Sequence, residues 1–406
     1  MNTKQNFLVL GAAAALLAVS CSKSDSTTTN TQPIPVSNPI TPGNISGYVK
    51  GTFTTGNTYT ITGDITIKKG DTLASQEGVT IIVKNDAQIF VQGVLNIVGT
   101  QDKPVSFNSD NNKPGSWGGI QCDTMVSSVT IKWANIQNTG GPDPAGDARK
   151  SVFVNSVVPC NVDIEDCWFT NGQDDLIRIQ NGAHVTILRN TITCSGSTDG
   201  EAINLKSGIT GDVAYNVIYS QAGTGVKLET NALKPIPQTN INVYNNTLVS
   251  NGWRRGQAEP GRGVSVGVYA TAKIYNNIFV NNYQGLEIFT DADTSASTKY
   301  GNNLFYATQN TYQDTTQGGN LAISIKAGFY PSDGVGKPQS SDLISTGVGN
   351  QDPMFVSYDG KVATPNGATT SNDYHLKTGS PAIGKGNATY NNDIGAYTSD
   401  GKGNKH

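Results

Sequence analysis

The sequence predicts an all-β fold, a right-handed parallel β-helix, which is a solenoid with an internal asparagine ladder and capped ends. Three observations predict it: asparagine recurs at one position of an irregular repeat, short segments alternate apolar and polar residues, and no stretch shows clear helical periodicity. The chain also exceeds the ~250–300 residues at which single cores stop growing, a limit that a solenoid escapes because it grows in one dimension.

The first 20 residues are predicted to be an export signal. Lys4 supplies positive charge, and residues 7–19 form an apolar run that is too short to cross a bilayer comfortably. Small residues then precede Cys21, a pattern that resembles a bacterial lipobox, in which the cysteine is acylated after cleavage. An ordinary secretory signal cut before Cys21 is the alternative. We therefore expect a lipoprotein anchored through Cys21 to the outer membrane or cell surface. A position on the periplasmic face of the membrane is an alternative.

Composition divides the rest of the chain. Residues 21–44 are rich in Ser, Thr, Asn and Pro and lack the apolar content to fold, so we expect a flexible tether that reaches ~25 Å. Residues 45–120 are predicted to form the N-terminal cap and first coils, residues 121–305 the core coils, and residues 306–406 the C-terminal coils and cap.

Charge and cysteine content narrow the possible partners. A formal net charge of -3 and the lack of a basic stripe argue against nucleic acid. Disulfides are permitted in an exported protein, but sequence cannot choose among the three full pairings, and isolated buried thiols are an equal alternative. No CxxC or His/Cys cluster suggests zinc. The cysteines concerned are Cys122, Cys160, Cys167 and Cys194.

A repeated six-residue pattern carries the fold prediction. It occurs at residues 131–136, 164–169, 187–192, 213–218, 243–248, 274–279 and 300–305. A side-chain amide at its fourth position can bond its own turn and the amide one coil away, and asparagine tolerates left-handed backbone geometry. With copies 23 to 33 residues apart, we expect a ladder of Asn190, Asn216, Asn246, Asn277 and Asn303, with Ala134 and Cys167 as departures at its start.

A second strand is expected after each ladder residue, because apolar and polar residues alternate there with period two. The residues expected to point into the core are Ile177, Ile203, Val226, Val264 and Leu286. Two outward columns are expected beside them, one of Arg178, Asn204, Lys227, Ser265 and Glu287 and the other of Gln180, Lys206, Glu229, Gly267 and Phe289.

The spacing and the ladder resemble the pectate-lyase-like superfamily of right-handed β-helices, and the resemblance covers most of residues 45–397. Two stretches, residues 65–120 and 352–396, look like the ends of β-helix proteins found on cells of the Bacteroides group. The resemblance implies terminal caps that hide apolar faces, and a glycan that lies along one outer sheet.

The outward columns and the loops that enter their strands form the candidate binding face. The longest loop, residues 251–262, contains Trp253, which we expect to stack on a sugar ring, and three arginines that can fork onto carboxylate or sulfate. A solvated loop with Trp253 folded back onto the core is the alternative. The candidate substrate-binding residues are Trp253, Arg254, Arg255, Arg262, Lys227, Glu229, Tyr283 and Glu287.

Residues 199–207 read Asp-Gly-Glu-Ala-Ile-Asn-Leu-Lys-Ser. They resemble the strand that bears the catalytic lysine of family 6 polysaccharide lyases, the chondroitinase B type. The resemblance implies that Lys206, with Arg178 one coil back, removes the C5 proton of a uronate, and that calcium neutralises the substrate carboxylate. The candidate calcium ligands are Asp199 and Glu201, with Asp174 and Asp175 one coil earlier.

The next coil departs from the lyase pattern. The family carries an arginine there that donates to the leaving oxygen, whereas this chain has Glu229. A carboxylate beside Lys206 stabilises the ammonium form, which opposes a role as a base, and Arg178 partly counteracts that effect. The alternative is an ion pair between coils on a solvated sheet.

The sequence supports a hydrolase active site less well than a lyase site. An inverting polygalacturonase needs separated Asp side chains, a Gly-His-Gly segment and a later Arg-Ile-Lys, and this chain has only His184, His375 and His406. The scarcity of histidine also weakens a Ser-His-Asp site. Three expectations remain: a cell-envelope lipoprotein that binds an acidic polysaccharide, one that also cleaves it by β-elimination, or a non-catalytic structural or adhesive surface protein.

Overall fold

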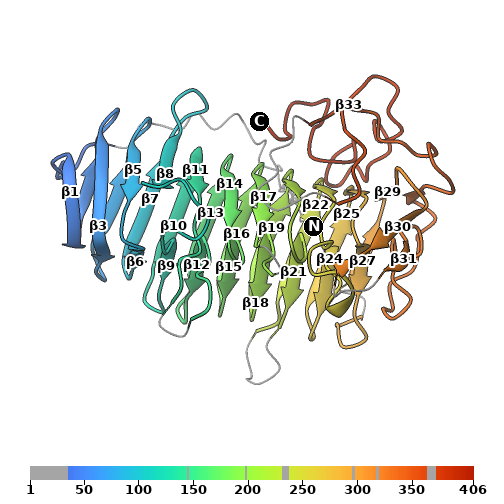
Figure 1. The fold of residues 1–406 in the computed structure, drawn as a ribbon, viewed down its shortest axis with the longest axis horizontal. Helices are drawn as coiled ribbons and strands as arrows, with labels where there is room; N and C mark the ends of the chain where they lie inside the picture. Colours follow the sequence, from blue (N-terminus) through green and yellow to red (C-terminus); the bar gives the residue numbers. More distant parts are fainter. Residues whose placement is uncertain are drawn as a thin grey trace, which may run out of the picture. The chain divides into compact units, whose positions relative to one another are not determined.

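The computed structural model describes residues 35–143, 146–196, 199–230, 237–294, 298–316, 320–363 and 372–406, which all belong to one compact unit, Thr31–His406. The chain winds into stacked coils of three short strands each, and successive coils pair in parallel (Figure 1). The predicted parallel β-helix is therefore confirmed. The predicted signal peptide and Cys21 lie outside the described residues. Within the described ranges, no helix is long and apolar enough to cross a membrane.

One strand of each coil belongs to a 10-stranded sheet. Its strands are β2 (Gly51–Phe53), β4 (Thr72–Ser75), β7 (Val94–Val98), β10 (Ser128–Lys132), β13 (Cys160–Glu165), β16 (Ala183–Leu188), β19 (Thr210–Ala214), β22 (Asn240–Tyr244), β25 (Thr271–Tyr275) and β28 (Lys299–Gly301).

The other two strands of each coil belong to a 20-stranded sheet, which β1 (Gly43–Tyr48) and β3 (Thr58–Ile67) begin. A first series follows the 10-stranded sheet along the chain: β5 (Thr80–Val83), β8 (Val105–Ser109), β11 (Ala134–Gln137), β14 (Trp168–Gly172), β17 (Thr191–Ser195), β20 (Val217–Tyr219), β23 (Thr247–Val249), β26 (Ile278–Val280), β29 (Leu304–Tyr306) and β32 (Leu343–Ile344). A second series completes the coils: β6 (Ile89–Val91), β9 (Ile120–Cys122), β12 (Val152–Asn155), β15 (Ile177–Gln180), β18 (Ile203–Lys206), β21 (Val226–Glu229), β24 (Arg262–Gly267) and β27 (Gln284–Ile288).

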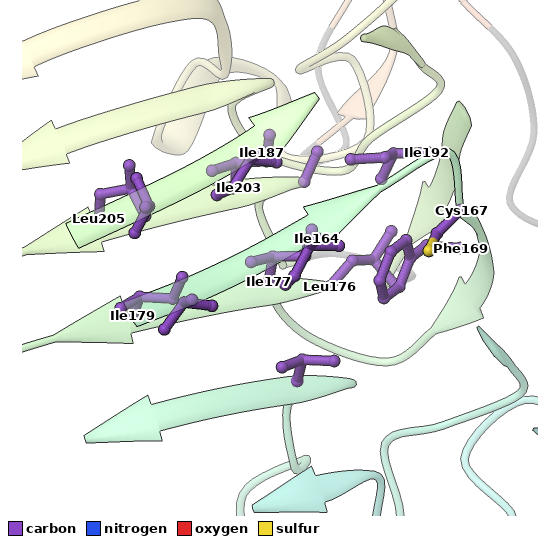
Figure 2. Close-up of a cluster of buried hydrophobic side chains, with 14 of the residues drawn as sticks. Ile164, Cys167, Phe169, Leu176, Ile177, Ile179, Ile187, Ile192, Ile203 and Leu205 are labelled. Carbon is purple, nitrogen blue, oxygen red and sulfur yellow. The ribbon is translucent and has the colours of Figure 1, made fainter. Parts of the chain in front are cut away.

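The core is a stack of apolar side chains, one above another. Ile164 pairs with Ile187 and Ile187 with Val213 in the 10-stranded sheet, and Ile177 pairs with Ile203 in the second series. All of these side chains are fully buried, and Figure 2 shows several of them gathered between the strands of neighbouring coils. Each such side chain contributes about 1.5–3 kcal/mol through burial.

The predicted asparagine ladder is confirmed. Each ladder Oδ1 accepts from the backbone N–H and the Nδ2 of the residue one coil earlier, at 2.9 to 3.0 Å. The backbone N–H of Cys167 donates to Asn190 at the start, and that of Asn303 donates to Asp342 at the end. The ladder thus satisfies amides in the turns, where no strand could pair them.

A second internal ladder was not predicted. Gln221 accepts from the Ser195 N–H, Asn251 from the Gln221 N–H, and Asn282 from the N–H and Nδ2 of Asn251. All four residues are buried. Asn251 was expected in the long loop beside the binding face, and the structure corrects this because its amide points into the stack.

The end of the chain does more than close the last coil. β30 (Thr311–Asp314) and β31 (Leu321–Ser324) form an antiparallel hairpin, and residues 328–335 then pair with β27. Farther on, β33 (Phe355–Ser357) and β34 (Asp373–Leu376) form a second antiparallel pair.

The final segment runs back along the outside of the coils. Asn245 Nδ2 donates to the carbonyl of Asp393, Asn404 Nδ2 donates to that of Asn190, and the His406 ring stacks on Trp168 with centroids 3.9 Å apart. An apolar cluster forms where this region covers the outer face of the first series; its buried members are Val217, Val249, Ile278, Val280, Leu304, Tyr306, Phe355, Tyr374, Ala382, Ile394 and Ala396.

The structure shows whether three of the cysteines form disulfides, which the sequence left open. Cys122, Cys160 and Cys167 are unpaired and buried. Burial raises the pKa of each thiol, so all three remain protonated and unreactive.

Candidate functional site

One outward position of the second series runs through the whole stack. Phe153 pairs with Arg178, Arg178 with Asn204, and Asn204 with Lys227, as predicted for the last two pairs. We call this column the outward strip; from first to last rung it consists of Tyr48, Thr66, Phe90, Gln121, Phe153, Arg178, Asn204, Lys227, Ser265 and Glu287.

The predicted orientations along these strands are confirmed on the core side. Ile177, Ile203, Val226, Val264 and Leu286 are all fully buried. The second outward column is also in register, since Gln180 pairs with Lys206, Lys206 with Glu229, and Glu229 with Gly267.

Exposure along the outward strip differs from the prediction. Phe90, Gln121, Phe153 and Arg178 are partly exposed, whereas Asn204, Ser265 and Glu287 farther along are buried, and Lys227 among them stays partly exposed. Two segments lie beside these later rungs. Residues 251–262, which we call the arginine strap, lie against the turns that enter β18 and β21, and residues 328–335 lie against β27.

Trp253 is folded onto the core rather than presented to a sugar. The residue is 4% exposed, and its indole N–H donates to the Asn281 carbonyl at 2.6 Å. Its ring packs against Tyr283 and Tyr312, with centroids 4.7 and 4.5 Å away. Trp253 was expected to stack on a sugar ring; the structure instead shows the alternative, a tryptophan folded back onto the core. Tyr283 is likewise buried and donates to Asp314.

Arg254 and Arg262 are also committed to internal contacts. Arg254 donates to the carbonyls of Ser195 and Ser220 at 2.6 and 2.8 Å. Arg262 donates to Glu287, and burial raises the pKa of Glu287 against the opposing charge of that arginine. These groups hold the strap and the last rungs in place, so their predicted role in substrate binding has no support in this geometry.

Arg255 gathers three carboxylates. It donates to Asp199, to Glu201 at 3.0 Å and to Glu259 at 3.1 Å. Gly223 makes room for it, because a Cβ at that position would lie 3.2 Å from Arg255 Cζ and 3.1 Å from Glu201 Oε1. The strap thus places the Arg255 guanidinium next to the carboxylates of Asp199 and Glu201.

A buried pair of carboxyl groups lies beneath Arg255. Asp175 Oδ1 accepts from the Glu201 N–H at 2.8 Å, and its Oδ2 accepts from Asn204 at 2.8 Å. Burial and the neighbouring Asp175 charge raise the pKa of Glu201 well above its usual value. Burial also acts on Asp175, but bonds from Glu201 and Asn204 and the charge of Arg178 hold its pKa below the usual value. The two pKa values are thus shifted in opposite directions, upward for Glu201 and downward for Asp175.

The four predicted calcium ligands do not fit a divalent cation in this arrangement. Asp174 lies 2.8 Å from Lys150 Nζ, and Asp175 lies 3.8 Å from Arg178 Nη1. Arg255 stands between the other two. A second cation would be repelled by these side chains. Across the described ranges, no group of three or more His, Cys, Asp or Glu side chains is arranged to hold a metal.

Lys206 is held in an ion pair between coils. Its Nζ lies 2.8 Å from Glu229, and Lys227 Nζ lies 3.4 Å from the same carboxylate. Burial opposes ionisation of Glu229, but the two ammonium groups hold its pKa below the usual value. The Lys206 side chain is therefore engaged by Glu229 of the next coil.

The open part of the face is a pocket of about 430 Å³ on β6, β9, β12 and β15. Phe90, Phe153, Arg149, Lys150 and Arg178 are among its lining residues. Both phenyl rings are partly exposed, and the Arg178 guanidinium lies 5.9 Å from the Phe153 centroid. The pocket thus combines flat apolar surfaces with three basic side chains and two acidic ones, Asp123 and Asp143.

Among the three basic side chains of the pocket, Arg178 lies farthest from an acidic partner. Arg149 and Lys150 have acidic partners at 3.4 and 2.8 Å, whereas the carboxylate nearest Arg178 is 3.8 Å away. Arg178 Nε is buried without a hydrogen-bond partner in the described structure. The partly exposed Arg178 side chain lines the pocket, where its guanidinium can donate to an anionic acceptor.

Sequence analysis included Arg178 but missed Phe90, Phe153, Arg149 and Lys150. The signal was present, since residues 89–91, 120–122 and 152–154 repeat the apolar–outward–apolar pattern of the later second strands. The six-residue repeat begins at residue 131, and the earlier coils do not contain its asparagine.

The comparisons with known proteins agree with the fold. Residues 43–130 match the family described as "Pectate-lyase like beta helix domain", and residues 118–305 match "Right handed beta helix region". No curated protein matches the chain significantly. A solved structure titled "Crystal structure of pectate lyase Pel9A" is similar over 79% of this chain and 88% of its own, at 14% identity and a TM-score of 0.37, which is too distant to support an argument. The fold of residues 43–305 is therefore that of a right-handed parallel β-helix, and residues 43–130 are similar to the pectate-lyase-like β-helix family.

Proposed function

We propose that this protein binds an acidic polysaccharide in the pocket on β6, β9, β12 and β15. The observation that carries the proposal is Arg178, whose Nε has no partner and whose guanidinium lines the pocket beside two partly exposed phenyl rings. A uronate or sulfated sugar has the matching chemistry: an anionic group for the guanidinium, and an apolar ring face for Phe90 or Phe153.

Binding, rather than cleavage, is the function that the geometry supports. β-Elimination would need the Lys206 amine to reach a substrate proton, and that amine is paired with Glu229 at 2.8 Å. Calcium does not fit the acids that the lyase resemblance would assign to it, because basic side chains already neutralise them. The second outward column is then a structural ion-pair network between coils.

Affinity electrophoresis in gels that contain polygalacturonate, alginate or chondroitin sulfate tests the proposal, with dextran as the neutral control. We expect retardation by at least one anionic polymer and none by dextran. Arg178→Ala should weaken binding about 10- to 100-fold, since a hydrogen bond to a charged group contributes about 1.5–3 kcal/mol.

The matched control is Lys273→Ala, which removes one positive charge from the exposed face of β25 in the 10-stranded sheet. It should leave retardation unchanged. A wild-type protein that none of the polymers retards would refute binding and favour a structural or adhesive role. Release of ultraviolet-absorbing unsaturated ends, lost in Lys206→Ala, would instead establish a lyase.

We also propose that Cys21 carries the lipid anchor that holds this binding face near the cell envelope. The support is the lipobox-like pattern before Cys21 and the polar stretch after it. Metabolic labelling with a palmitate analogue should mark the wild-type chain and not Cys21→Ser. Equal labelling of both, or of neither, would contradict the anchor.

A further inference from the structure

Aromatic side chains occupy alternate rungs at the open end of the outward strip. Counting from β1, the first six rungs are Tyr48, Thr66, Phe90, Gln121, Phe153 and Arg178, each paired in register with the next. The rings stand on rungs one, three and five. Buried neighbours such as Ile65, Ile67, Ile89 and Val91 fix the outward orientation of these positions.

The spacing of the rings suits an extended glycan. Neighbouring strands are ~4.8 Å apart, so rings on alternate rungs are ~10 Å apart, which is about the length of two sugar units of an extended chain. A polysaccharide that lies along the solenoid axis can therefore place every second sugar over a ring, with the sugar between facing Thr66 or Gln121.

Tyr48 has the exposure that such a contact requires. It is 73% exposed at the end of the strip, whereas large aromatic side chains elsewhere in the core are buried. Lys68 Nζ lies 3.3 Å from the centroid of its ring. The first six rungs therefore have a cation over an aromatic ring near both of their ends, Lys68 over Tyr48 and Arg178 over Phe153.

The other end of the strip is covered. Asn204, the rung after Arg178, is buried, and Arg255 holds the strap over the turn that enters β18. A ligand seated in the pocket can thus extend freely toward β1 along the strip.

We propose that the binding surface extends from the pocket to Tyr48, so that an acidic polysaccharide lies along the axis across six rungs, stacked on Phe153, Phe90 and Tyr48 in turn. This inference rests on the proposed function, because it assigns further subsites to the same ligand. It predicts that affinity depends on ligand length up to about the span of the three rings, four strand spacings or ~19 Å.

Titration of Tyr48→Ala with disaccharide-sized and octasaccharide-sized fragments of polygalacturonate, alginate and chondroitin sulfate tests it. The variant should bind the long fragments of the retained polymer about 2- to 10-fold more weakly, and the disaccharide as wild type does, because one aromatic contact is lost only when the ligand reaches it. Tyr269→Ala removes a ring of similar exposure, 60%, on the turn after β24 and should change neither titration.

The outcomes separate the two proposals. If Arg178→Ala weakens binding while Tyr48→Ala leaves the long fragments unaffected, the extended surface is wrong and the pocket stands. Equal weakening of short and long fragments by Tyr48→Ala would also overturn it, since that points to a general structural effect. If wild type binds no fragment at all, the proposed function fails and this inference falls with it.

Discussion

The asparagine ladder should be among the most sensitive features of the fold, and Asn246→Ala measures its contribution. Asn246 Oδ1 accepts from the N–H and Nδ2 of Asn216, and its Nδ2 donates to the carbonyl of Val213 and to Asn277 Oδ1. Its Nδ2 also donates to the carbonyl of Tyr244, and truncation removes all five bonds in a fully buried turn. At about 1–3 kcal/mol for each buried group left without a partner, the Asn216 N–H and the Val213 carbonyl alone give a loss of about 2–6 kcal/mol.

Urea unfolding followed by far-ultraviolet circular dichroism checks this value. Asn242→Ala is the matched control, because it makes the same chemical change on the outer face of the same coil, where the amide bonds Asp212 at a partly exposed position. We expect the control to cost less than about 1 kcal/mol. A loss below about 1 kcal/mol for Asn246→Ala would refute the view that the ladder satisfies turn amides that nothing else can reach.

Three further predictions follow from the strap, the acid pair and the C-terminal segment. Arg255→Ala should lower the free energy of unfolding by about 1–3 kcal/mol. It should also make the melting temperature rise on addition of calcium, which the wild type should not show. Stabilisation of the wild type by calcium would contradict the view that Arg255 neutralises Asp199 and Glu201. The pKa of Glu201 is raised in the folded state, so the folded protein holds the Glu201 proton more tightly than the unfolded chain does. The free energy of unfolding of the wild type should therefore fall as pH rises above about 4.5, by up to ~1.4 kcal/mol per pH unit. Glu201→Gln should flatten this dependence of unfolding free energy on pH, and the same dependence in both proteins would argue against a raised pKa of Glu201. Ile394→Ala should loosen the segment that covers the first series, at a cost of about 2–5 kcal/mol locally, and speed its removal by protease; an unchanged cleavage pattern would show that this burial does not hold the segment in place.

The coils could be predicted from sequence because their information is local and repeated. Apolar residues at every second position decide which side chains face inward, and a slip of one residue would expose all of them. The recurring asparagine then fixes which residues of successive coils are neighbours. The pairing of Arg178 with Asn204 and of Lys206 with Glu229 follows from these two patterns alone. The second ladder carried the same signal in Asn251 and Asn282, which are also one coil apart.

The site could be predicted only in part. Alternation shows that Asn204 and Lys227 point outward, but not what lies on top of them. The strap reaches Asp199 and Glu201 from more than 50 positions away in the sequence, and its tryptophan finds Tyr312 farther still. Such contacts depend on how a long loop balances burial of its ring against exposure of its charges, which no short pattern encodes.

The sequence alone therefore settled the winding of the chain, the register of its rungs and the face on which chemistry can lie, because each of these follows from short-range patterns that every coil repeats. Only the tertiary structure decided which part of that face is open. Coverage depends on segments remote in sequence, the strap over the turns that enter β18 and β21 and residues 328–335 over β27. The rungs from Tyr48 to Arg178 are all at least partly exposed, whereas beyond them Asn204, Ser265 and Glu287 are buried.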